Sequence, residues 1–489
     1  LSASLLGAVI GIACLSQVLP GVIVSAYGSI YTIPNGGAPY PIQLDSALLS
    51  GLSGIGITLL STMAAVLSSL KEEPSSLMLP KAPKAGSKIF LERVKPLWSR
   101  LSFSWKVTIR NLVRYKRRLI MTLVGIAGCT ALLLVAFGLR DSISDIIDNQ
   151  WPAISHYDYI VGMTSDVSEE EADQINAELN QVGATNIHRI TRENVLLESP
   201  TQKAGSLTRT TIMTSNSLQD LTGLATLRNR LSGQAIELGE DSVVITEKLA
   251  KRLGVGVGDT IQVYAQDRIG NASGEPSTLT ITGVAENYVG SYLYVGPSAW
   301  RSLGIQDDAT DGWYATLPED QTTRDVFGEK LINQAGVATV DDVNEAIHTY
   351  KESLAVVNRV VAILIVAAAL LAFIVLYNLT NINIEERIRE IASLKVLGFT
   401  RHEVDAYVFR EIALLAIFGA LFGLVLGTYL EGFVVQTAEI DLVMFGRAIH
   451  APSYWFAFGL TLVFSLLVYV AMRPKLKNID MVESLKSVE

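Results

Sequence analysis

The sequence predicts an α-helical integral membrane protein with about six transmembrane helices and an inserted extracytoplasmic α+β domain. Hydrophobic residues make up 49% of the chain and charged residues only 18%, with a mean hydropathy of +0.34. This composition is too apolar for an ordinary soluble protein. The apolar residues gather in stretches that can cross about 30 Å of hydrocarbon. A segment of roughly 220 residues between two of these stretches is instead polar, with alternating strand-like and helix-like patterns.

Six apolar stretches predict the membrane helices. Two of them lie in residues 1–70. The other four are residues 119–139, 356–380, 404–432 and 453–473. Within residues 404–432, Gly419, Gly423 and Gly427 follow one another at four-residue spacing, which puts them on one face of a helix.

A basic segment, residues 71–118, fixes the predicted orientation. It contains many Lys and Arg residues but only three acidic residues, Glu72, Glu73 and Glu92. Short basic loops stay in the cytoplasm, so this segment is predicted to be a cytoplasmic linker. The alternation of spans then places residues 140–355 and 433–452 outside the cell, and residues 381–403 and the tail 474–489 in the cytoplasm.

The end of the linker, residues 101–118, is predicted to form an amphipathic lead-in helix at the membrane interface. Trp105 belongs to its apolar stripe. The basic face holds Lys106, Arg110, Arg114, Arg117 and Arg118. A basic amphipathic helix with a Trp side chain is typical of a segment that lies among anionic lipid headgroups.

Residues 140–355 are long enough to form a domain, and acids outnumber bases there by about two to one. Short strands alternate with short helices, which indicates an α+β domain with a mixed sheet. Expected elements include strands at 242–245, 260–264 and 278–284 and helices at 169–181 and 247–253. From residue 340 the pattern becomes helical, and we expect one long helix that enters the span 356–380.

The clearest functional signal lies in residues 385–399, EERIREIASLKVLGF. Apolar residues recur at three- and four-residue spacing, which predicts an amphipathic helix. They are Ile384, Ile388, Ile391, Leu394 and Leu397, and the opposite face holds Glu386, Arg387, Arg389, Glu390 and Lys395. Gly398 is placed to end the helix. A helix lying only among headgroups would be basic, so the mixed charges favour docking to another protein.

Several classes of function are disfavoured. The sequence contains no G-x-x-x-x-G-K-[ST] motif, so ATP hydrolysis is not expected in this chain. Gly254, Gly256 and Gly258 precede an expected strand and predict a turn rather than a nucleotide site. The histidines are scattered without metal-ligand spacing, and the net charge of −9 argues against a nucleic-acid binder. We therefore expect no catalytic, cofactor-binding or metal site.

Residues 386–398, ERIREIASLKVLG, resemble the signature of the FtsX-like permease family, the MacB type of ABC transporter. In that family the segment is the coupling helix, which seats in a groove of the cytoplasmic ATPase. The resemblance implies that the ATPase-coupling residues are Glu386, Arg387, Arg389, Glu390, Ile391, Leu394, Lys395, Leu397 and Gly398. Residues 105–127, 242–284 and 479–486 resemble other parts of such a permease, and the inserted domain is expected to be of the MacB periplasmic-core type.

The resemblance also implies partners. They are a cytoplasmic ABC ATPase dimer that binds the ATP and Mg, membrane lipids, and another permease half, either in the same chain or in a second copy. Residues 1–70 look like the last two helices of a preceding permease unit, so an internally duplicated protein is expected. An extracellular protein partner is a further expectation.

Two functions follow from the resemblance. The first is a permease subunit in the bacterial plasma membrane, in which ATP hydrolysis by the partner moves the extracytoplasmic domain and extrudes a lipid, lipoprotein or peptide. The alternative is a non-transporting regulator that activates an extracellular cell-wall hydrolase or senses antimicrobial peptides. The membrane features are the same in both.

Overall fold

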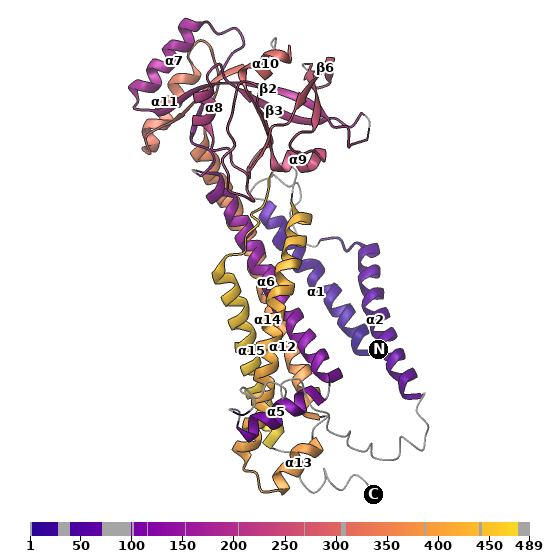
Figure 1. Cartoon of the computed structure of the whole chain (residues 1–489). Coiled ribbons are helices and arrows are strands. Elements are labelled where there is room, and N and C mark those ends of the chain that lie inside the picture. Colours follow the sequence, from indigo (N-terminus) through magenta and orange to yellow (C-terminus); the bar gives the residue numbers. More distant parts are fainter. Residues whose placement is uncertain are drawn as a thin grey trace. The chain divides into compact units, whose positions relative to one another are not determined.

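The computed structural model describes residues 2–27, 40–70, 99, 102–114, 116–151, 153–203, 205–267, 269–304, 310–385, 388–439 and 443–477. The chain forms two compact units (Figure 1). We call Leu1–Phe137, Ala355–Glu431 and His450–Glu489 the helical unit, and Gly138–Leu354 with Gly432–Ile449 the sheet unit. The predicted fold class, a helical membrane protein with an inserted α+β domain, is confirmed.

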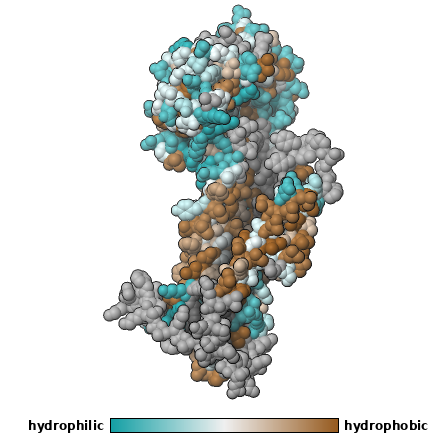
Figure 2. All heavy atoms as spheres, turned by 90° about the vertical axis from the view of Figure 1, so that its right-hand side faces the viewer, coloured by the Kyte–Doolittle hydropathy of each residue, from teal (hydrophilic) through white to brown (hydrophobic). Residues whose placement is uncertain are grey.

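The helical unit is built from long apolar helices. Its own helices are α1 (Ser2–Tyr27), α2 (Leu44–Leu70), α5 (Phe103–Arg114), α13 (Ile388–Val396) and α15 (Ala451–Lys477). Three more helices have residues in both units: α6 (Lys116–Gln150), α12 (Val343–Glu385) and α14 (Arg401–Ala438). Figure 2 shows apolar side chains over the surface of these helices, as expected of a surface that lipid tails cover.

Five described helices are long and apolar enough to cross a membrane. The candidate spans are Leu44–Ala64, Leu119–Gln150, Val361–Ile382, His402–Thr437 and Ala451–Lys475. The first of the six predicted spans lies in α1, where the described apolar stretch Ser2–Val18 is shorter than a full span. The linker residues 71–98 and the tail residues 478–489 lie outside the described residues.

The spaced glycines of α14 allow close helix packing. A Cβ added at Gly423 would lie 2.6 Å from the Ala127 carbonyl oxygen and 2.6 Å from Thr130 Cβ, both in α6. Gly419 and Gly427 approach α6 in the same way. The backbones of α6 and α14 therefore touch along a stripe of small residues, as in closely packed membrane helices.

Replacing Gly423 with valine is expected to destabilise the helical unit by about 1–3 kcal/mol, because the rigid α6 backbone cannot move away from the new side chain. The control is Gly432→Val in the same helix, where a Cβ meets nothing within 4 Å. Thermal unfolding of the full chain in detergent measures both variants. Equal melting temperatures would contradict this account of the packing.

The sheet unit holds one mixed sheet with ten strands. Its order is β10-β1-β9-β2-β3-β8-β4-β7, and β5 pairs with β2 and β6. The strands are β1 (Tyr159–Met163), β2 (Thr185–Glu198), β3 (Thr208–Thr214), β4 (Val243–Thr246), β5 (Thr260–Gln266), β6 (Ala272–Thr280), β7 (Gly283–Ala285), β8 (Tyr292–Val295), β9 (Thr310–Thr316) and β10 (Val337–Asp342). The pairs β3–β8 and β4–β7 are parallel, and the others are antiparallel.

Short helices cover this sheet: α7 (Glu169–Gln181), α8 (Leu218–Leu224), α9 (Glu247–Leu253), α10 (Pro297–Ser302) and α11 (Gln321–Ile332). The predicted bounds of α7 and α9 are confirmed. Helix α7 begins at a capping box in which Ser168 and Glu171 satisfy each other's backbone N–H groups. Its Ile175 and Leu179 are fully buried in a core with Tyr159 and Phe327.

Some predicted element bounds are wrong. The expected strand 278–284 is two strands, because β6 completes a hairpin with β5 and the chain then crosses to pair β7 with β4. The long helix α12 begins at Val343 rather than near residue 340, since β10 pairs with β1 as far as Asp342. Helix α6 continues beyond residue 139 to Gln150, and α14 continues to Ala438. Ile146 of α6 is buried in the sheet unit, which accounts for the extension of α6.

Candidate functional site

The predicted coupling segment forms α13 and the turn that follows it. Ile391 and Ala392 are almost fully buried. Ile391 packs in the core of the helical unit with Val404 and Tyr407 of α14. One face of α13 is therefore fixed to the membrane helices, as its apolar spacing predicts.

Beyond this buried face, the segment exposes apolar side chains. Val396, Leu397 and Phe399 are 60%, 75% and 45% exposed, and we call these three residues the apolar tip. Gly398 has a φ of +90°, the left-handed conformation that ends a helix and that the sequence predicts at this position. Leu397 belongs to the apolar stripe of the predicted amphipathic helix, and it is exposed because α13 ends at Val396 and the chain turns there.

Polar interactions are present at the helix ends near the apolar tip. Thr400 and Glu403 form a capping box at the start of α14. Lys475 of α15 pairs with Glu385 at the end of α12, with Nζ 2.6 Å from Oε1. The capping box fixes the start of α14 directly after the apolar tip, and the ion pair joins the ends of α12 and α15.

The charged face of the coupling segment stays a prediction. Glu386 and Arg387 lie outside the described residues, and the side chains of Arg389, Glu390 and Leu394 are likewise not described. Lys395 is partly buried and takes part in an interaction within the chain.

The lead-in helix α5 packs against the other helices of its unit. The Arg410 guanidinium of α14 lies over the Trp105 ring, 5.8 Å from its centre. Val107 and Leu112 pack against the buried core, whereas Arg110 and Arg114 are exposed. Lys106 is partly buried, and the side chains of Arg117 and Arg118 are not described. The sequence missed the contact of Trp105 with α14, because the two lie far apart along the chain.

In the sheet unit, the end of α6 is held by Gln150. This side chain is 2% exposed. Its Nε2 donates to Ser155 Oγ at 2.9 Å and to Asn287 Oδ1 at 3.1 Å. Its Oε1 accepts from the backbone N–H groups of Tyr288 at 2.8 Å and Val289 at 3.2 Å. One glutamine thus ties the last turn of α6 to the loop between β7 and β8.

The start of α12 is held by Arg324 of α11, which is 1% exposed. Its Nε and Nη2 donate to the two carboxylate oxygens of Asp342, both at 2.7 Å, and Nη1 donates to Asp158. The backbone N–H of Val343, the first residue of α12, donates to the Asp158 carbonyl at 2.8 Å. Burial opposes the charge of Arg324, but the hydrogen bonds to Asp342 and Asp158 outweigh it and raise the pKa of Arg324.

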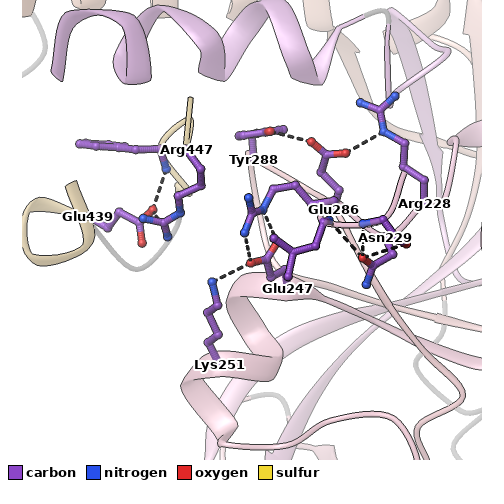
Figure 3. Close-up of polar contacts among 12 residues, drawn as sticks. Arg228, Asn229, Glu247, Lys251, Glu286, Tyr288, Glu439 and Arg447 are labelled. Carbon is purple, nitrogen blue, oxygen red and sulfur yellow. Dashed lines mark hydrogen bonds and ion pairs between the residues drawn. The ribbon is translucent and has the colours of Figure 1, made fainter. Parts of the chain in front are cut away.

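Figure 3 shows two further ion-pair networks of the sheet unit. Arg228 pairs with Glu286, which also accepts from the Tyr288 hydroxyl at 2.6 Å. Arg230 donates to both oxygens of Glu247, which also pairs with Lys251. Burial raises the pKa of Glu247, but the hydrogen bonds from Arg230 and Lys251 outweigh burial and lower the pKa to about 2.

The Glu247 carboxylate predicts an acid-dependent loss of stability. Its folded pKa of about 2 lies below 4.5, the ordinary pKa of a glutamate, so its stabilisation is present above pH 4.5 and is lost as the pH falls toward 2. The shift corresponds to about 3 kcal/mol at neutral pH. Glu247→Gln is expected to flatten the stability profile between pH 4.5 and pH 2, as measured by urea unfolding. Glu240→Gln, an exposed control, should keep the slope of the parent.

The comparisons with known proteins match two regions of the chain. Residues 119–347 match the family model of the MacB-like periplasmic core domain, and residues 362–481 match that of the FtsX-like permease C-terminal domain. No curated protein matches the chain significantly in sequence. Among solved structures, the periplasmic region of MacB from Actinobacillus actinomycetemcomitans is similar, at 13% identity and a TM-score of 0.24, over 42% of this chain and 98% of that chain.

Membrane-spanning helices around an inserted α+β domain define a multi-pass membrane protein with an extracytoplasmic domain. The two matched regions then identify the family: the chain belongs to the FtsX-like, MacB-type permeases of ABC transporters. Permeases of this family are the transmembrane components of their transporters and work with ABC ATPases. The family predicted from residues 386–398 is confirmed.

Proposed function

We propose that this chain is the permease subunit of an ABC complex in which a separate ATPase dimer docks on α13 and the apolar tip. The observation that carries the proposal is the contrast within this short segment. Ile391 is 1% exposed and anchored, whereas Leu397 is 75% exposed. An anchored helix with an exposed apolar end suits a contact that must transmit force, because movement of the docked partner moves the helix bundle.

A route for transmission is present in the chain itself. Helices α6, α12 and α14 each have residues in both units, so the units are joined by continuous helical backbone. In the sheet unit the end of α6 is bound by Gln150, and the start of α12 by Arg324 and its aspartates. A displacement of these helices is therefore expected to reach the sheet. We propose that ATP binding and hydrolysis by the partner drive this movement, and that it extrudes a lipid, lipoprotein or peptide.

The proposed complex requires ATP and Mg as cofactors. The described part of the chain contains no group of three or more His, Cys, Asp or Glu side chains that could hold a metal ion. We propose that ATP and Mg bind only to the partner ATPase and that this chain is not itself an enzyme.

The test is purification of the native complex in mild detergent with a trapping nucleotide analogue, followed by mass spectrometry of the associated proteins. An ABC ATPase in stoichiometric amount is the expected result. A co-purified cell-wall hydrolase would indicate that the complex regulates that enzyme and does not extrude a substrate. Absence of an ATPase, even after cross-linking, would overturn the coupling role.

A further inference from the structure

A basic pocket lies within the sheet unit. It has a volume of about 330 Å³, in the lower range of ligand pockets. It is lined by Lys248, Lys251, Arg252, Gln436, Glu439, Met444 and Arg447. The three cations of α9 have the spacing of one helix face. Gln436 lies in the last turn of α14, and Glu439, Met444 and Arg447 follow that helix.

The charges of the pocket are unbalanced. Among the described lining residues, Glu439 is the one carboxylate, and it lies between two cations. Its oxygens lie 3.4 Å from Lys248 Nζ and 2.7 Å from Arg447 Nη2. Glu439 also accepts from the backbone N–H of Phe445 at 2.9 Å. Figure 3 shows the Glu439–Arg447 pair and Lys251, which contacts Glu247. Among the residues that the structure describes, four positive side chains thus line the hollow, with Glu439 in the lining and Glu247 paired to Lys251 beside it.

Arg447 carries the second observation. Its side chain is 15% exposed, and its Nε and Nη1 atoms are buried without a hydrogen-bond partner among the described residues. Leaving guanidinium N–H groups buried and unbonded is unfavourable, so an acceptor is expected beside them. An anion with several oxygens satisfies an arginine fork and neighbouring lysines together, which is the chemistry of a phosphate group.

The chain position of the pocket indicates where the phosphate comes from. Glu439 follows by two residues the end of the candidate span His402–Thr437, at the end that the family assignment places outside the cell. Basic residues that follow the end of a membrane-spanning helix are the ones best placed to meet lipid headgroups. We propose that this pocket binds the phosphate of an anionic phospholipid of the outer leaflet. The proposal goes beyond the coupling function and does not depend on the ATPase.

The test uses the full chain in detergent, titrated with short-chain phosphatidylglycerol while native mass spectrometry resolves the tightest bound lipid. Arg447→Gln is expected to weaken that site about tenfold or more, because charge-assisted hydrogen bonds are lost. The matched control is Arg301→Gln, which removes an exposed arginine from α10 of the same unit and should leave the affinity within about twofold of the parent. Equal affinities of the two variants would overturn the proposal.

Two further arms identify the chemistry. Diacylglycerol of the same chain length lacks the phosphate and should not occupy the Arg447-dependent site, and occupancy equal to that of phosphatidylglycerol would overturn the phosphate assignment. Inorganic phosphate should compete only weakly, and Arg447-dependent binding of phosphate as tight as that of the lipid would overturn the lipid source.

If Arg447→Gln fails to fold, Lys251→Gln takes its place as the test of the proposal. Lys251 is 57% exposed, and its loss should weaken the lipid site about threefold, whereas an unchanged affinity would contradict the proposal.

Discussion

Replacing Arg324 with methionine is expected to lower the free energy of unfolding of the sheet unit by about 3–5 kcal/mol, the typical cost of removing one partner from a buried ion pair. The variant leaves Asp342 and Asp158, which are 12% and 20% exposed, without their shared cation. It also removes the side chain that holds the residues at the start of α12. Urea-dependent proteolysis of the full chain in detergent measures the change.

The matched control for this prediction is Arg301→Met. Arg301 is 61% exposed and lies 3.7 Å from Glu240, so its loss should cost less than about 0.5 kcal/mol. Adding Asp342→Asn and Asp158→Asn to the Arg324 variant should recover part of the loss, because the uncompensated carboxylates are then gone. A single variant as stable as the parent would show that Arg324 does not anchor α12.

Replacing Leu397 with aspartate is expected to reduce the amount of co-purified ATPase about tenfold or more, the scale on which a central apolar residue contributes to an interface. Leu397 is 75% exposed, so the change places a charge at the apolar tip without disturbing the buried core. The stability of the isolated chain should stay within about 0.5 kcal/mol of the parent. Quantitative mass spectrometry of the purified complex and stimulated ATP hydrolysis measure the effect.

Leu231→Asp is the control for the apolar tip. Leu231 is 83% exposed and belongs to the sheet unit, so the substitution adds the same charge outside the unit that contains α13. It should leave ATPase recovery unchanged. If Leu397→Asp retained full ATPase recovery and full ATPase activity, the apolar tip would not be part of the coupling contact. Buried Ile391 is less suitable for this test, because its replacement would also perturb the packing of the helical unit.

Together, the two predictions separate the two ends of the proposed transmission route. Leu397 tests whether the partner engages the chain, and Arg324 tests whether a long helix is fixed to the sheet. A less disruptive substitution, Arg324→Lys, keeps the charge but loses the bidentate geometry. If transmission depends on this anchor, Arg324→Lys should retain the ATPase while reducing the effect of ATP on the sheet unit, as read by hydrogen exchange of β10.

The sequence by itself determined the features that depend on local chemistry. Apolar runs predicted the long helices, the local pattern predicted α7 over residues 169–181, and Gly398 predicted the end of α13, because each signal needs only residues that are near neighbours in the chain. The signature in residues 386–398 was enough to predict the family.

The tertiary structure alone decided the order of the strands and the contacts that this order makes possible. Arg324 meets Asp158, 166 residues away, and no local pattern distinguishes it from a solvent-exposed arginine of a short helix. The packing of distant segments likewise decides that Leu397 is exposed and that the cations of α9 line one pocket with Arg447. Helical spacing specifies which residues share a face but not what covers that face.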